Sequence, residues 1–396
     1  MTFGFNEKIK EILRIIVVKI KGIALMLLFT PGPTPVPEFV RSAMNTPTIH
    51  HRTAEFEAIF KTTRELLKEM LKMQEVLMLA SSGSGALEAS LISLCSKKVL
   101  TINSGKFGER FGKIARAFNI PCVEIKNEWD TPVSLREVMN AIQENPDIDA
   151  FCIQACESAG GLRHPYEEIA KAIKAHNPDI MVIVDAITAM GVEPLDVSCV
   201  DALIGGSQKA FMLPPGMSII ALSQSAINKI EQRDVGFYFN LKTELKNQRK
   251  NTTAWTAPTT IIIGLCAFLE QAKKIGFEKI YRETKARSLA CDEAMMAINL
   301  KVYPKIPAIS MTTIYDEQSD EIRKILKNDF QVNIAGGQDF LKGKIFRINQ
   351  MGIIPLSEIA WVVNAVELTL DKINRRTFNG LANQVFLEQY LRLSGY

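Results

Sequence analysis

Three short polar segments in this chain carry residue types that can do chemistry, and each follows an apolar run. Residues 81–85, read as SSGSG, come after EVLMLA (75–80) and lead into a helical segment. Small residues with free N–H groups at the start of a helix form an anion site, most often for phosphate. Asp185 ends the run IMVIVD, and Lys209 follows two glycines at 205 and 206. Each has an ordinary alternative when taken alone: a turn, a cap or a solvated lysine.

Together, these features match what pyridoxal 5′-phosphate requires of a protein. The 81–85 loop would hold the phosphate, Asp185 would pair with the protonated pyridine nitrogen, and Lys209 would form the Schiff base. Burial among apolar residues would lower the pKa of the Lys209 amine and free it for nucleophilic attack. Phe107 follows the run KVLTIN (98–103) and is a candidate aromatic cover for the ring, with core packing as the alternative.

These residues must be positioned by a sheet, because short apolar runs alternate with helical segments through the first two thirds of the chain. Strands that are buried on both faces read as continuous apolar runs, and alternation with helices favours a mainly parallel sheet. We therefore expect an α/β fold, a doubly wound and mostly parallel seven-stranded sheet. Its strands are expected at 75–80, 98–103, 121–125, 150–155, 180–185, 202–206 and 217–222.

The pattern of predicted elements changes after about residue 258, where long helical segments are followed by short strand candidates and further helices. This is an α+β pattern and predicts a second, smaller domain. We divide the chain into an N-terminal extension at 1–25, a large domain at 26–285 and a small C-terminal domain at 286–396.

Composition excludes several classes of function. Lys plus Arg number 47 and Asp plus Glu 43, a formal charge of +4 with no basic stripe, so nucleic acid is not an expected partner. Seven irregularly spaced cysteines in a chain of 396 residues favour reduced thiols and a cytoplasmic location. Cys152 and Cys156 lie in an apolar run without a paired histidine, so we expect core residues and no metal.

The extension at 1–25 is apolar, but Lys19 and Lys21 interrupt it, so no run of about 20 apolar residues forms. A membrane role is therefore not expected, with an amphipathic helix lying on a membrane as the alternative. We interpret the segment as a non-catalytic extension, or as a start assigned too early with Met26 as the true start.

The sequence resembles the class V pyridoxal-phosphate-dependent aminotransferases, in the branch of the alanine–glyoxylate, serine–glyoxylate and serine–pyruvate enzymes. The matching segments occur in family order and span about residues 26–390. They are TPGPTPVP (30–37), HHRTAEF (50–56), SSGSGALEA (81–89), NSGKFGER (103–110), ESAGG (157–161), IVDAITAMG (183–191), GGSQKAFMLPPG (205–216), TAWTAP (253–258) and IFRINQMG (345–352). The resemblance implies fold type I of the pyridoxal-phosphate enzymes and a homodimer with shared active sites.

The resemblance also implies roles for single residues. Lys209 corresponds to the lysine of the internal aldimine, Asp185 to the partner of the pyridine nitrogen, and Arg347 to the clamp on the substrate carboxylate. Thr256 corresponds to a phosphate ligand donated by the other subunit. The expected cofactor-binding residues are Ser82, Gly83, Ser84, Phe107, Ser158, Asp185, Gln208, Lys209 and Thr256. In the ESAGG segment two hydroxyls that relatives carry after Ser158 are missing, which weakens any transfer of exact substrate preference.

The implied function is transamination by a ping-pong route, from alanine or serine to glyoxylate or pyruvate. Phosphoserine or aspartate aminotransferase on the same fold is the alternative, and it needs a second cation, for which His50, His51, Arg52 and Arg163 are the candidates. A desulfurase needs a catalytic cysteine in the small domain, and residues 292–396 contain none. A non-enzymatic subunit is the remote alternative.

Overall fold

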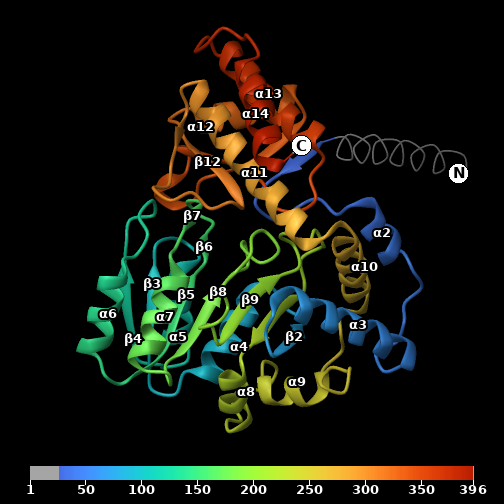
Figure 1. The fold of residues 1–396 in the computed structure, drawn as a ribbon, viewed down its shortest axis with the longest axis vertical. Coiled ribbons are helices and arrows are strands. Elements are labelled where there is room, and N and C mark those ends of the chain that lie inside the picture. Colours follow the sequence, from blue (N-terminus) through green and yellow to red (C-terminus); the bar gives the residue numbers. More distant parts are fainter. Residues whose placement is uncertain (1–25, 396) are drawn as a thin grey trace, which may run out of the picture.

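A seven-stranded sheet forms the centre of the computed structural model, which describes residues 26–395 (Figure 1). The expectations for residues 1–25 lie outside the described residues. The strand order is β2-β10-β9-β8-β5-β3-β4; β10 runs antiparallel to β2 and β9, and the pairs from β9 to β4 are parallel. This confirms the predicted doubly wound, mostly parallel sheet. Its strands are β2 (Glu75–Leu79), β3 (Lys98–Asn103), β4 (Cys122–Lys126), β5 (Ile148–Gln154), β8 (Met181–Asp185), β9 (Ala202–Gly206) and β10 (Ser218–Leu222).

Helices cover both faces of this sheet, which explains the continuous apolar runs of its strands. In β2, Val76 and Met78 belong to the apolar core on one face, and Leu77 and Leu79 to the core on the other. Residues of α2 (Glu38–Met44), α3 (Ala54–Leu71), α6 (Leu135–Glu144), α7 (Tyr166–His176) and α10 (Thr259–Ile275) fill the first core. Residues of α4 (Gly83–Leu94), α5 (Gly108–Ala117), α8 (Gln224–Glu231) and α9 (Leu241–Gln248) fill the second.

A second sheet of five strands lies with the C-terminal helices (Figure 1). Its order is β1-β13-β14-β12-β11, and a 3₁₀ turn, η1 (Asp339–Leu341), separates β13 from β14. Its strands are β1 (Leu27–Phe29), β11 (Lys301–Val302), β12 (Met311–Tyr315), β13 (Val332–Gly336) and β14 (Ile345–Asn349). Its helices are α11 (Phe277–Ala297), α12 (Ser319–Asp329), α13 (Leu356–Lys372) and α14 (Leu381–Ser394).

Two features of this unit were not anticipated. β1 pairs in parallel with β13, so residues 27–29 join a sheet whose other strands come from residues 301–349, although the sequence assigned them to the 26–285 domain. A three-residue strand carries no signal of its partner. The tail helix α14 buries Phe386 and Tyr390 in the second unit's core.

Helix α11 connects the two units, as Figure 1 shows. Ile280 near its start belongs to the core of the large sheet, whereas Ala290 and Met295 belong to the core of the small unit. The expected boundary at residue 285 therefore falls inside one continuous helix, and the division into domains stays a prediction. Between residues 26 and 395, no helix has both the length and the apolar character needed to cross a membrane.

Candidate active site

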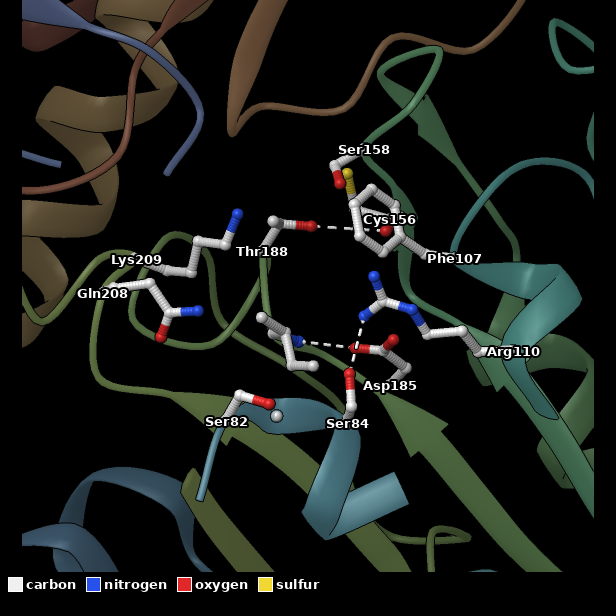
Figure 2. Close-up of a pocket in the computed structure, with 12 residues that line it drawn as sticks. Ser82, Ser84, Phe107, Arg110, Cys156, Ser158, Asp185, Thr188, Gln208 and Lys209 are labelled. Atoms are coloured by element: carbon white, nitrogen blue, oxygen red, sulfur yellow. Dashed lines mark hydrogen bonds between the residues drawn. The ribbon is translucent and has the colours of Figure 1, made fainter. Parts of the chain in front are cut away.

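The predicted cofactor residues meet at the carboxyl edge of the large sheet, where the loops after β2, β3, β8 and β9 converge. Side chains from parallel strands and their loops gather at this edge in open α/β sheets. They enclose a cavity of about 240 Å³, shown in Figure 2. Its lining consists of Ser82, Gly83, Ser84, Phe107, Arg110, Cys156, Ser158, Asp185, Ile187, Thr188, Gln208 and Lys209.

Lys209 follows β9 and extends into this cavity. Its Nζ donates a hydrogen bond to the carbonyl of Pro31, and its own carbonyl accepts one from Thr34 Oγ1 at 2.7 Å. The proline-rich segment that the sequence marked only as a family motif therefore holds the lysine at both ends. The pKa of Lys209 is lowered to about 8, chiefly by burial and also by the positive charge of Arg347.

Asp185 is the last residue of β8 and is buried. Its Oδ1 accepts the Ile187 amide at 3.0 Å. Burial raises its pKa to about 6, while the Ile187 amide and the charges of Arg110 and Lys209 act in the opposite direction. The carboxylate is therefore mostly ionised at neutral pH, the form that can pair with a protonated ring nitrogen.

The 82–84 segment forms the amino end of α4, with Ser82 as the N-cap residue. The Ser82 side chain makes no capping hydrogen bond, so the positive end of the helix stays available for an anion. Gly83 packs directly on Ile187, because a Cβ built on it would lie 2.3 Å from Ile187 Cδ1. A larger residue at 83 would push into the floor of the cavity.

Arg110 is a cavity residue that the sequence analysis missed. Its Nη1 donates to Ser84 Oγ at 2.9 Å, and its guanidinium lies 4.6 Å from the centroid of the Phe107 ring. Arg110 follows Phe107 by three residues in α5, the spacing at which side chains share one face of a helix. This spacing is visible in the sequence and could have placed Arg110 beside Phe107. Thr188 was also missed; its Oγ1 donates to the Cys156 carbonyl at 3.2 Å (Figure 2).

The cavity residues fit the expected phosphorylated aromatic cofactor. Gln208 Oε1 is buried and lacks a hydrogen-bond partner in the described part of the chain, so it can accept one from a bound molecule. An open helix start, an ionised carboxylate, an aromatic ring and a lysine amine lie around the cavity, and these are the groups that the phosphate, ring nitrogen, ring face and aldehyde of such a cofactor would require. These donors and acceptors lie around one cavity, as the sequence predicted.

Arg347 lies on β14 of the small unit but reaches the large unit beside the cavity. Its Nη1 donates to the carbonyl of Ser158, which lines the cavity, and its Nη2 donates to the carbonyl of Gly336. Its Nε is buried without a partner among residues 26–395. Burial lowers the pKa of Arg347 to about 10, and the nearby Glu157 carboxylate opposes this shift. The guanidinium is thus held at the junction of the two units.

Thr256 is the one predicted cofactor residue that lies apart. It is exposed and borders a separate, smaller hollow together with Tyr238 and Trp255. Within one chain it does not line the Lys209 cavity. The sequence had placed its contact in the neighbouring subunit, and that contact stays a prediction.

The electrostatics of the cavity predict how Lys209 reacts in cofactor-free protein. Its rate of modification by an amine-specific reagent should rise with pH with a midpoint near 8, because only the neutral amine reacts. Arg347→Gln should move the midpoint upward, because removing a neighbouring positive charge favours the protonated amine. Peptide mass spectrometry across a pH series measures both, with the exposed Lys274 as the internal reference. A wild-type midpoint at the ordinary lysine value of about 10.4 would contradict the burial of the amine.

Comparisons with known proteins agree with this geometry. The family model described as Aminotransferase class-V matches residues 28–351. An "uncharacterized aminotransferase" of Helicobacter pylori is 57% identical over 366 residues, which cover 92% of this chain and 99% of that protein. A serine–glyoxylate aminotransferase of Methylorubrum extorquens is 28% identical and covers 87% of this chain and 90% of that one.

A solved structure shows the same architecture. The aspartate aminotransferase of subgroup IV from Thermus thermophilus aligns with a TM-score of 0.82 and 28% identity, over 87% of this chain and 99% of that one. Because the family model spans most of the length and the cavity holds the matching donors, this chain belongs to the class V aminotransferase family and is a pyridoxal-phosphate-dependent transaminase of fold type I.

Proposed function

We propose that this aminotransferase takes the amino group of a small amino acid, alanine or serine, and transfers it to a small 2-oxo acid, glyoxylate or pyruvate. The observation that carries the proposal is the charge around the substrate end of the cavity. There Arg347 meets the turn Ser158–Ala159–Gly160–Gly161, which bears no charge and no large side chain. Such a wall accommodates a short, neutral side chain beside one carboxylate.

The cations offered by the sequence for a second anionic group are engaged or distant. Arg163 pairs with Glu193 at 2.9 Å and with Glu167, and it does not line the cavity. His50, His51 and Arg52 lie on the loop before α3, outside the cavity lining. None of these four candidates lines the cavity, and Arg110, which does line it, already donates to Ser84 Oγ. A second carboxylate or a phosphate would therefore gain no unengaged partner from them, which is costly.

The second candidate is a substrate with two anionic groups, and Arg323 is the observation that favours it. This arginine of α12 lies against Gly336 and lowers the pKa of Arg347 through its positive charge. However, its Nη1 already pairs with Asp320 at 2.8 Å, so a substrate anion would have to compete with that carboxylate. The names of the similar proteins, serine–glyoxylate and aspartate aminotransferase, are compatible with either candidate.

The cofactor would be held by the residues around the cavity. Ser82 to Ser84 and the amino end of α4 would bind its phosphate, Phe107 would cover its ring, and Asp185 would pair with the ring nitrogen. Gln208 Oε1 would accept a hydrogen bond beside it. When bound, pyridoxal phosphate supplies an electron sink that lets the proton on the substrate Cα leave.

The protein's own residues then perform two tasks. Arg347 binds the substrate α-carboxylate through a planar guanidinium, which suits a carboxylate better than an ammonium does. Lys209, whose amine has a pKa lowered to about 8, would hold the cofactor covalently and, once released, would accept and return a proton at the substrate Cα. We infer two half-reactions, in which the first 2-oxo acid leaves before the second binds.

The assembly that we propose is a homodimer in the cytoplasm. Thr256 lies beside exposed aromatic side chains: Phe237 is 79% exposed and Tyr238 43% exposed, and both rings pack on Trp255. Clustered exposed aromatic residues are typical of protein–protein interfaces. Seven free cysteines, four of them buried, support a reducing compartment.

Asp185→Asn should lower kcat/KM by more than about tenfold, because the ring nitrogen loses its charged partner; tenfold is only about 1.4 kcal/mol of barrier. The matched control is Asp201→Asn. Asp201 is equally buried and pairs with Lys174, but it lies outside the cavity. The control should lower the melting temperature and keep kcat/KM. A loss below tenfold in Asp185→Asn would mean that Asp185 has a structural role.

Substrate choice is tested by competition among alanine, serine, aspartate and phosphoserine, with kcat/KM measured for each donor against glyoxylate and pyruvate. We expect alanine or serine to be preferred by at least about tenfold, the discrimination that an unpaired buried charge produces. A preference of that size for aspartate or phosphoserine would overturn the proposal and assign the second anionic group to Arg323.

Assembly is tested with Thr256. Thr256→Ala should weaken cofactor binding, and mixing it with inactive Lys209→Ala protein should restore activity only if sites are shared between subunits. Light scattering should show a dimer at the assay concentration. A fully active monomer would contradict the shared site.

A further inference from the structure

Glu157 is a fully buried carboxylate that the mechanism above does not use. It lies on β6 (Cys156–Glu157), which forms a short hairpin with β7 (Leu162–Arg163) next to the cavity. A buried carboxylate is costly unless hydrogen bonds satisfy both oxygens. Among the described residues, the hydrogen bonds to the two Glu157 oxygens come from backbone amides. The position of the carboxylate therefore depends on those amides.

The amides come from two different walls of the site. Glu157 Oε2 accepts from Phe107 N at 3.0 Å and from Gly108 N at 2.7 Å, at the amino end of α5, where a helix favours a negative charge. Glu157 Oε1 accepts from Ala159 N at 2.9 Å, in the turn that carries Ser158. One carboxylate therefore connects Phe107, the expected cover of the cofactor ring, to the turn at 158–161, which we propose to face the substrate.

The same carboxylate also stabilises the positive charge of Arg347, since it opposes the effect of burial on the pKa of that guanidinium. Arg347 in turn donates to the carbonyl of Ser158, the residue next to Glu157. Gly105 lies against the Glu157 side chain, because a Cβ built on Gly105 would lie 2.4 Å from Glu157 Cδ. The carboxylate has little freedom to move.

We propose that Glu157 is a positioning residue: its ionised carboxylate holds Phe107, Ser158 and Arg347 in the arrangement that binds the substrate. The inference rests on the proposed function for the identity of the substrate, but the hydrogen bonds that support it do not. A protonated Glu157 cannot serve all three amides, because one oxygen then carries a proton.

The proposal has a pH dependence. Burial raises the pKa of Glu157 from 4.5 to about 7, and the neighbouring Asp185 on β8 adds to this; the three amides act in the opposite direction. The other groups facing it are Arg347 on β14 and the Cys156 thiol on its own strand. The KM for the amino acid should therefore rise as the pH falls through about 7.

The first test compares the holoenzyme with Glu157→Gln, which keeps the side-chain length but places an amide group against N–H donors. KM should rise about tenfold or more, the effect of losing a hydrogen bond to a charged group, with a smaller fall in kcat. The variant should also lose the pH dependence of KM near 7. The matched control is Glu193→Gln, a partly buried carboxylate whose pKa burial also raises; it pairs with Arg163 away from the cavity and should keep the wild-type KM profile.

A second variant, Gly105→Ala, keeps the Glu157 carboxylate but displaces it. It replaces Glu157→Gln in the test if that variant does not fold. It should raise KM in the same direction and reduce the circular dichroism of the bound cofactor, because Phe107 is no longer held. That signal does not depend on turnover, so it judges the role of Glu157 even if none of the tested amino acids is a substrate.

A stability measurement supplies a third readout. A folded-state pKa raised above its unfolded value contributes stability that is present below about 4.5 and lost as the pH rises through about 7. Glu157→Gln lacks this loss, so its melting temperature relative to wild type should rise between about pH 5 and pH 8. A wild-type KM and pH profile in Glu157→Gln, or wild-type KM and circular dichroism in folded Gly105→Ala, would overturn the proposal.

Discussion

The constraint on which the rest of this structure depends is that opposite charges must share one cavity at the edge of an apolar sheet. Burial raises the pKa of Asp185 to about 6 and lowers that of Lys209 to about 8, so each group is destabilised in its charged form. Each charge also shifts the pKa of the other group back toward its ordinary value. For Asp185, the Ile187 amide and the charge of Arg110 act in the same direction as the charge of Lys209.

The sheet satisfies this constraint through neighbouring parallel strands. β8 ends at Asp185 and pairs in parallel with β9, after which Lys209 follows, so their carboxyl ends lie side by side. The loop after β2 starts a helix at the same edge, and the loop after β3 brings Phe107 and Arg110. Apart from the edge strand β4, the strands are largely buried on both faces, which leaves the loops as the place where polar side chains can gather.

The small unit completes the site from the other side. Arg347 lies on β14 between β12 and β13, and it contacts the large unit through the carbonyl of Ser158. Glu157 lies beneath that contact and connects it to the first turn of α5. The Pro31 carbonyl, which holds the Lys209 amine, follows directly after β1 of the small sheet. Motion between the two units would therefore change the contacts of Lys209 and Arg347.

The sequence by itself determined the seven strands of the large sheet, because strands buried on both faces are mostly apolar and so stand out from their surroundings. The residues alone also indicated that the loop at 82–84, Phe107, Asp185 and Lys209 are neighbours, since the carboxyl ends of parallel strands lie at one edge of the sheet. Ser158 and Gln208 were added by the resemblance to the class V aminotransferases. Only the tertiary structure decided which other side chains reach that point. The pairing of β1 with β13 joins residues about 300 positions apart, and a three-residue strand has no pattern that names its partner. Glu157 and the Pro31 carbonyl entered the site through contacts between segments far apart in the chain, which local sequence patterns do not encode. Arg110 also contacts Ser84, from a different segment, and only its spacing from Phe107 could be read from the sequence.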